Sequence, residues 1–87
     1  MKATNQLLQA FLDAKDAESL QEFLLGLFTP QELEQLNQRI EIVGLLKQGM
    51  PQREIADTLG VGIATVTRGA REIKMGRFEN IVSKNNE

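Results

Sequence analysis

The sequence predicts an all-α fold of five to six short helices that contains a helix-turn-helix. No segment alternates apolar and polar residues with the period of two that marks a half-buried strand. Apolar side chains recur instead at three- and four-residue spacings, and residues that start or stop helices, such as Pro30 and Gly60, bound these segments. The 87 residues allow one domain. We divide this domain into core and dimerisation helices at 1–49, a helix-turn-helix at 51–74 and a short tail or helix at 75–87.

The first two expected helices cover the N-terminal third of the chain. Residues 4–15 place their apolar side chains on one helical stripe. Asp16 then provides the N-cap of a second helix, and Glu18 suits the positive end of that helix. The apolar residues of the two helices are Leu7, Leu8, Phe11, Leu12, Leu20, Phe23, Leu24 and Leu27.

The third helix has the clearest start signal in the sequence. Thr29-Pro30-Gln31-Glu32 is a capping box with proline at the first helical position. We expect this helix to run to about Gln48 and to end at Gly49. Gly44 lies near one edge of its apolar arc, and the sequence leaves open whether another helix crosses there or the glycine is only tolerated. The expected buried arc is Leu33, Leu36, Ile40, Val43 and Leu46.

Two further helices are joined by a tight turn. Pro51 opens the fourth helix, which ends at Leu59, and Gly60 supplies the positive φ that the turn needs. The fifth helix runs from Ile63 to about Lys74, where Met75-Gly76 ends it. In the core we expect Ile55, Leu59, the small Ala56, the turn residue Val61 and one face of the fifth helix formed by Ile63, Val66, Ala70 and Ile73.

The remainder of the chain is polar apart from Phe78, Ile81 and Val82. Residues 77–87 therefore form one more short helix or fray.

The composition excludes several classes of protein. The chain has no cysteine, so no disulfide framework or thiolate metal site is available. It also has no histidine, the commonest general base, and we predict neither an enzyme nor a resident cofactor. No apolar run approaches the roughly 20 residues that span a bilayer, and residues 1–6 lack the features of a signal peptide. We expect a soluble cytoplasmic protein that does not contact a membrane.

Charge is distributed unevenly along the chain. The net charge is −2 and the pI is about 5.1. Residues 1–46 nevertheless carry a net −4, residues 47–77 a net +3 and residues 78–87 a net −1. Because binding responds to the local field, this asymmetry favours a DNA-reading face on an acidic body.

The outer face of the fifth helix favours DNA binding. Short hydroxyl and long cationic side chains on an exposed helix are the groups that reach base edges and phosphates. The alternatives are an ordinary solvated polar face and a surface that binds another protein. The residues outside the core face are Thr65, Thr67, Arg68, Arg71 and Lys74.

Two arginines stand at unusual places. Arg39 falls between Val43 and Leu46 on the apolar arc of the third helix, so it must reach solvent, pair with a carboxylate such as Glu18 or Glu22, or bind a ligand. Gly69 leaves a gap beside Arg68, which either holds a small anion-bearing ligand or is filled by a neighbouring helix. Spacing alone does not decide between these readings of the gap.

Four blocks of the sequence resemble the bacterial tryptophan operon repressors. The resemblance covers about half of the chain, and the final Thr-Arg-Gly of its last block is rare in other helix-turn-helix proteins. The chain departs from the family at Ala56, where a lysine that contacts DNA is usual, and at Ala70-Arg71-Glu72, where Ser-Asn-Ser is usual. The blocks are Thr29-Pro30-Gln31-Glu32, Arg39-Ile40-Glu41-Ile42-Val43, Gln52-Arg53-Glu54 and Gly62-Ile63-Ala64-Thr65-Val66-Thr67-Arg68-Gly69.

The resemblance implies an intertwined homodimer with L-tryptophan as its corepressor. The indole ring would lie between two arginines that match Arg39 and Arg68, in a pocket whose other positions match Thr29, Thr65 and Gly69. Bound tryptophan would wedge the two reading helices apart, so that both enter successive major grooves. The matched DNA-contacting positions are Gln52, Arg53, Gly62, Ile63, Ala64, Thr65, Thr67 and Lys74, to which the outer face of the fifth helix adds Arg71.

The expected function is sequence-specific repression of transcription. The expected partners are double-stranded operator DNA, a second copy of the chain and a small amino-acid ligand. One alternative is a regulator of the same fold that needs no ligand or answers to another effector. A second is a protein-interaction module.

Overall fold

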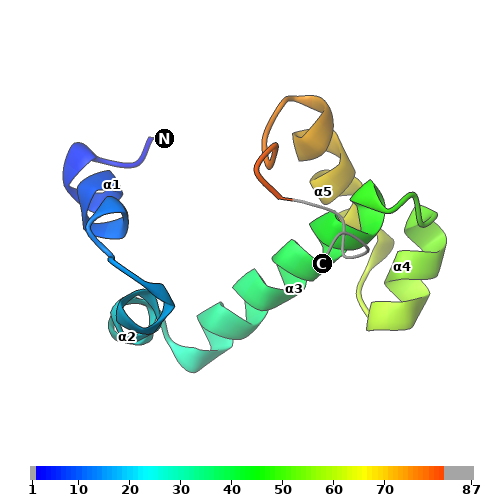
Figure 1. Cartoon of the computed structure of the whole chain (residues 1–87). Helices are drawn as coiled ribbons and strands as arrows, with labels where there is room; N and C mark the ends of the chain where they lie inside the picture. Colours follow the sequence, from blue (N-terminus) through cyan, green and yellow to red (C-terminus); the bar gives the residue numbers. More distant parts are fainter. Residues whose placement is uncertain (1, 82–87) are drawn as a thin grey trace. The chain divides into compact units, whose positions relative to one another are not determined.

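The computed structural model of the chain describes residues 2–81, and within them it contains helices and no strand, which confirms the all-α prediction. The chain divides into two compact units, Met1–Gln35 and Leu36–Glu87, and the third helix contributes to both. None of the helices in the described range is long and apolar enough to cross a membrane. The helices are α1 (Asn5–Leu12), α2 (Ala17–Leu27), α3 (Pro30–Lys47), α4 (Gln52–Leu59) and α5 (Ile63–Lys74) (Figure 1).

Side-chain caps set the two helices of the first unit. The Thr4 hydroxyl accepts a hydrogen bond from the Leu7 amide at 3.1 Å, and α1 begins directly after it. The Asp16 carboxylate accepts a hydrogen bond from the Ser19 amide at 2.7 Å, which confirms the predicted cap of α2. This backbone hydrogen bond, together with one from the Ser19 side chain, lowers the pKa of Asp16 below its ordinary value. The predicted extent of the first helix, 4–15, is wrong at its end, because the cap holds Asp16 in extended backbone and α1 stops at residue 12.

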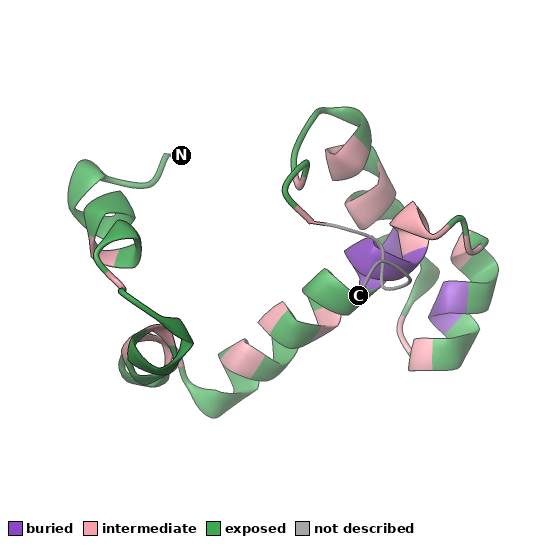
Figure 2. Cartoon of the chain, viewed as in Figure 1, coloured by how far each residue is buried: buried purple, intermediate pink, exposed green. Residues whose placement is uncertain are grey.

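The apolar side chains of the first unit remain accessible. Phe11 and Phe23 join α1 to α2 through an edge-to-face contact, with ring centroids 5.0 Å apart and planes at 86°. No residue between 2 and 35 is buried, as Figure 2 shows in green and pink. The exposed large apolar residues of this unit are Leu7, Leu8, Phe11, Leu12, Leu25 and Leu27.

The predicted capping box starts α3. The Glu32 carboxylate accepts from the Thr29 amide at 2.8 Å, while the Thr29 hydroxyl accepts from the Glu32 amide at 3.1 Å. The helix ends at Lys47, one residue before the predicted end, and Gly49 follows with a φ of 94°. The reciprocal bonds and the terminal glycine confirm both ends of this helix to within a residue.

Burial along α3 differs from the predicted arc. Ile40 was expected in the core but is 50% exposed, whereas Ile42 and Leu45, outside the expected arc, are buried. The prediction of this arc rests on the assumption that other elements cover only one face of α3. In the second unit, four consecutive residues from Ile42 to Leu45 are buried, because other elements pack on more than one side of the end of α3.

The helix pair α4 and α5 packs against this end of α3 (Figure 1). Gly60 adopts the predicted left-handed conformation, with a φ of 69°. The predicted burial of Ile55 and Ala56 is confirmed, and Val61 packs at the edge of the same cluster. The buried cluster consists of Ile42, Leu45, Ile55, Ala56 and Val66, with Leu46, Met50, Leu59 and Val61 packed around it.

Two expectations about α5 and the chain after it need correction. Ile63 was placed on the core face, but its side chain is 47% exposed because it lies in the first turn, beyond the reach of the buried cluster. Residues 75–80 form turns rather than a helix or a frayed end, and Gly76 and Phe78 adopt positive φ angles of 89° and 62°. The prediction for Val82 and the residues after it lies outside the described residues.

Candidate functional site: a helix-turn-helix beside a charged cleft

The residues predicted to contact DNA lie along α4 and α5 and in the turn between them. Eight of the nine are exposed, and Gln52, in the first turn of α4, is half-buried. The Gln52 side-chain oxygen accepts a hydrogen bond from the Thr67 hydroxyl at 2.8 Å, so two of the predicted contact residues tie the helices together. Gly62 caps α5 in extended backbone without a side-chain cap. The exposed members are Arg53, Gly62, Ile63, Ala64, Thr65, Thr67, Arg71 and Lys74.

A cleft of about 670 Å³ lies within the second unit, bordered by α3, α5 and residues 77–81, which we call the turn after α5. This volume is within the range of about 300–1,000 Å³ that is usual for small-molecule sites. The residues that line the cleft are Leu36, Arg39, Ile40, Thr65, Arg68, Gly69, Glu72, Arg77 and Phe78.

The structure brings four of the five predicted ligand-binding residues to this one cleft: Arg39, Thr65, Arg68 and Gly69. Arg39 and Arg68 are both exposed, so neither guanidinium is buried without a partner. The fifth residue, Thr29, belongs to the first unit, where it caps α3.

Gly69 permits a close approach of α5 to α3. A Cβ atom at this position would lie 3.4 Å from both the Ile42 Cγ2 and the Leu46 Cδ1 atoms. A neighbouring helix therefore fills one side of the gap that the sequence indicated. Gly69 also lines the cleft, so the gap is closed by α3 on one side and open to the cleft on another, and a ligand in it stays a prediction.

The sequence did not indicate that the other five residues lining the cleft lie together at one site. Leu36 and Ile40 were visible as apolar positions on α3, but were assigned to the core. Glu72 was visible only as a departure from the family pattern. Arg77 and Phe78 come from the polar end of the chain, and no periodicity or cap in the sequence indicates that this segment turns back to the cleft.

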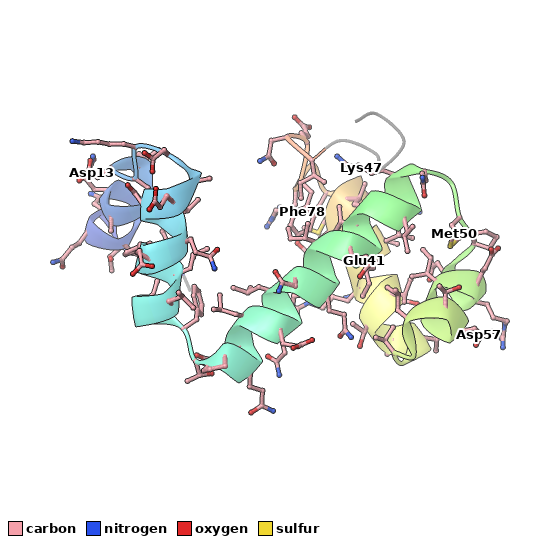
Figure 3. All side chains as sticks on the ribbon, turned by 60° about the horizontal axis from the view of Figure 1, so that its bottom comes forward. Asp13, Glu41, Lys47, Met50, Asp57 and Phe78 are labelled. Carbon is pink, nitrogen blue, oxygen red and sulfur yellow. The ribbon has the colours of Figure 1, made fainter. Side chains whose placement is uncertain are left out.

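The turn after α5 is attached to both helices that border the cleft. The Lys47 ammonium group donates hydrogen bonds to the carbonyl oxygens of Phe78 and Ile81, the latter at 2.7 Å. Lys47 and Phe78 are labelled in Figure 3 near the end of α3. On the other side, the Arg77 amide donates to the Glu72 carbonyl at 3.1 Å, and the Arg77 Nε lies 3.4 Å from the Glu72 carboxylate.

The charges around the cleft suit a ligand of mixed character. Three guanidinium groups and one carboxylate line it, beside the apolar side chains of Leu36, Ile40 and Phe78. A molecule with a carboxylate, an ammonium group and an apolar body complements all three features. Within the described residues, no three or more histidine, cysteine, aspartate or glutamate side chains come together as a group that could hold a metal ion.

Comparison with known proteins gives consistent matches. The chain matches the family model of the Trp repressor protein over residues 2–85. A Trp operon repressor homolog of Vibrio cholerae serotype O1 is 46% identical over 70 residues, which cover 79% of this chain and 68% of that protein. The homolog of Vibrio parahaemolyticus is 41% identical with the same coverage, and that of Vibrio campbellii is 40% identical over 74 residues, covering 84% and 74%. No solved structure gives a significant match to the chain.

Proposed function

We propose, from the premise that this chain belongs to the Trp repressor family, that it represses transcription by binding operator DNA when L-tryptophan occupies the cleft. The observation that carries the proposal is the double use of α5. Arg68, Gly69 and Glu72 line the cleft, whereas Arg71 and Lys74 are exposed and lie outside it. One rigid helix therefore couples ligand and DNA, because a ligand that orients α5 also orients the side chains that reach the grooves.

The cleft supports tryptophan as the ligand. Arg39 and Arg68 approach it from different helices, and a guanidinium group binds both carboxylates and the faces of aromatic rings. Leu36 and Ile40 offer apolar surface to an indole. The Glu72 carboxylate, whose Oε1 pairs with Arg77, offers its second oxygen to the α-ammonium group.

The exposed cations support operator DNA as the partner. Arg53 on α4 and Arg71 and Lys74 in the last turns of α5 are free to reach phosphates. The hydrogen bond between Thr67 and Gln52 fixes the two helices at the face that would meet the groove. Lys47 also belongs to the basic segment 47–77, but it is half-buried and donates its hydrogen bonds to the turn after α5.

A homodimer joined through residues 1–49 completes the proposal. Six large apolar side chains of α1 and α2 are exposed, and exposed apolar surface on this scale favours an interaction site. The mass of one chain is 9.7 kDa, so sedimentation equilibrium separates monomer from dimer directly. A mass that stays at the monomer value at working concentrations contradicts the dimer.

Calorimetric titration with L-tryptophan tests the ligand assignment. Arg39→Ala and Arg68→Ala each remove a charged hydrogen-bonding group, and we expect binding to weaken about ten- to hundredfold or vanish while the fold persists. Arg53→Ala is the matched control, because Arg53 is exposed on α4 and outside the cleft. Unchanged heats in both cleft variants would refute the pocket assignment.

Fluorescence anisotropy with operator DNA selected from genomic fragments tests the coupling. We expect L-tryptophan to strengthen DNA binding, and Thr67→Ala to weaken DNA binding without changing tryptophan affinity. DNA binding that ignores tryptophan would point to a ligand-independent regulator or another effector. Failure to bind any DNA, with or without tryptophan, would favour a protein-interaction module.

A further inference from the structure

We propose that the turn after α5, residues 77–81, is a ligand-binding wall of the cleft, in which Phe78 contacts the aromatic ring of the ligand and Lys47 is the positioning residue. The inference rests on the proposed function, because it takes an aromatic amino acid as the ligand. It adds a part of the site that neither the helix-turn-helix nor the two arginines on α3 and α5 include.

The turn is anchored at two places, so it forms a defined surface. On α3, Lys47 donates hydrogen bonds to the carbonyl oxygens of Phe78 and Ile81. On α5, Glu72 accepts a backbone hydrogen bond from Arg77 and ion-pairs with its side chain. The segment thus bridges the two helices that border the cleft, and two of its residues, Arg77 and Phe78, line the cleft.

The backbone of Phe78 is in a conformation that requires support. Its φ of 62° is rare for a bulky side chain, and such residues persist only where their surroundings hold them. Lys47 supplies that support, because it binds the carbonyl group of this same residue. The ammonium group at the end of α3 therefore holds the backbone that carries the Phe78 ring.

The ring borders open space rather than a filled core. Phe78 is half-buried and lines the cleft together with Leu36 and the half-exposed Ile40. Apolar side chains that face an accessible cleft gain burial when a ligand covers them. An aromatic ring also prefers offset or edge-on contact with another aromatic ring, which favours an indole or phenyl group as the part of the ligand seated here.

The ligand itself provides the probe. The chain contains no tryptophan and no tyrosine, so indole emission in a titration with L-tryptophan comes from the ligand alone. We expect the wild-type protein to shift this emission to shorter wavelength. Phe78→Ala should raise the Kd about two- to tenfold and reduce the shift at saturation. Met75→Ala is the matched control, because this side chain is 58% exposed beside the same turn and does not line the cleft.

The positioning role of Lys47 is tested in the same titration. Lys47→Met should weaken binding and reduce the emission shift as Phe78→Ala does, and the double variant should be no weaker than Phe78→Ala alone, because both changes remove the same contact. Lys47→Arg should restore most of the affinity, and Lys15→Met, a lysine exposed in the first unit, should have no effect.

The outcomes separate the inference from the proposed function. Wild-type protein that leaves indole emission unchanged overturns both. If the wild-type protein binds L-tryptophan, and Phe78→Ala and Lys47→Met bind it as tightly as Met75→Ala does, the wall is refuted while the proposed function stands. Circular dichroism checks the fold of each variant. If Phe78→Ala unfolds, Phe78→Leu keeps an apolar side chain, and an unchanged Kd and emission shift in that variant also overturn the inference.

Discussion

Two apolar residues of α5 share a face of the helix but differ in burial, and alanine substitutions at both measure that difference. Val66 is fully buried, whereas Ile63, three residues earlier, is 47% exposed. Val66→Ala removes two buried methyl groups at about 0.8 kcal/mol each. The cavity left in the close-packed cluster adds to this, which gives a loss of about 2–3 kcal/mol. Ile63→Ala removes a larger group from a half-exposed place, and we expect a loss below about 1 kcal/mol.

Thermal unfolding followed by circular dichroism at one protein concentration compares the two variants. In a domain of this size, each kcal/mol lowers the Tm by about 4–8 °C. We expect Val66→Ala to lower the Tm by about 10–20 °C, and Ile63→Ala by less than about 8 °C. The loss of operator affinity should show the reverse order, because the exposed Ile63 is among the residues that we propose to contact DNA, whereas Val66 is inaccessible. Equal shifts in Tm would refute the placement of Ile63 outside the core.

Three further predictions concern single charges. Glu72→Gln removes the carboxylate of the cleft. The preference for L-tryptophan over indole-3-propionate, which lacks the ammonium group, should therefore fall about tenfold. A variant whose preference in competitive titration equals that of the wild type would contradict this role of Glu72. Lys74→Ala should reduce the slope of log K against log salt by about one in anisotropy measurements across a salt series, and an unchanged slope would show that Lys74 contacts no phosphate. The pKa of Asp16 is lowered in the folded state, so its stabilisation of α2 is present above the ordinary pKa and lost as the pH falls through the lowered one. Asp16→Ala should therefore be less helical than the wild type at neutral pH and equal to it in acid, and a difference by circular dichroism that persists in acid would contradict the cap.

The helices could be predicted because their boundaries depend on neighbours in the chain. The capping box joins Thr29 and Glu32, and the cap of α2 joins Asp16 and Ser19, in both cases across three residues. Gly60 terminates α4 through its own backbone preference. Because these hydrogen bonds join residues that are close in the sequence, helix periodicity and capping residues are enough to predict where each helix begins and ends.

The candidate site could be predicted in part. Arg39 and Arg68 stood out on their helices, and the structure places both on one cleft. The sequence distinguishes Glu72 only as a departure from the family, and its periodicity predicts Ile40 in the core although Ile40 lines the cleft. A helical wheel shows which side chains share a face, but not which part of that face a neighbouring element covers.

The residue order was enough to predict the five helices, the caps of α2 and α3, the tight turn at Gly60 and the two arginines that line the cleft. The packing of the helices was needed to show that Ile63 is exposed while Val66 is buried, and that the chain after α5 turns back to border the cleft. The hydrogen bond from Lys47 to Phe78 spans 31 residues. A contact of that range leaves no periodic trace, because it exists only after α3 and α5 have packed and brought the two segments together.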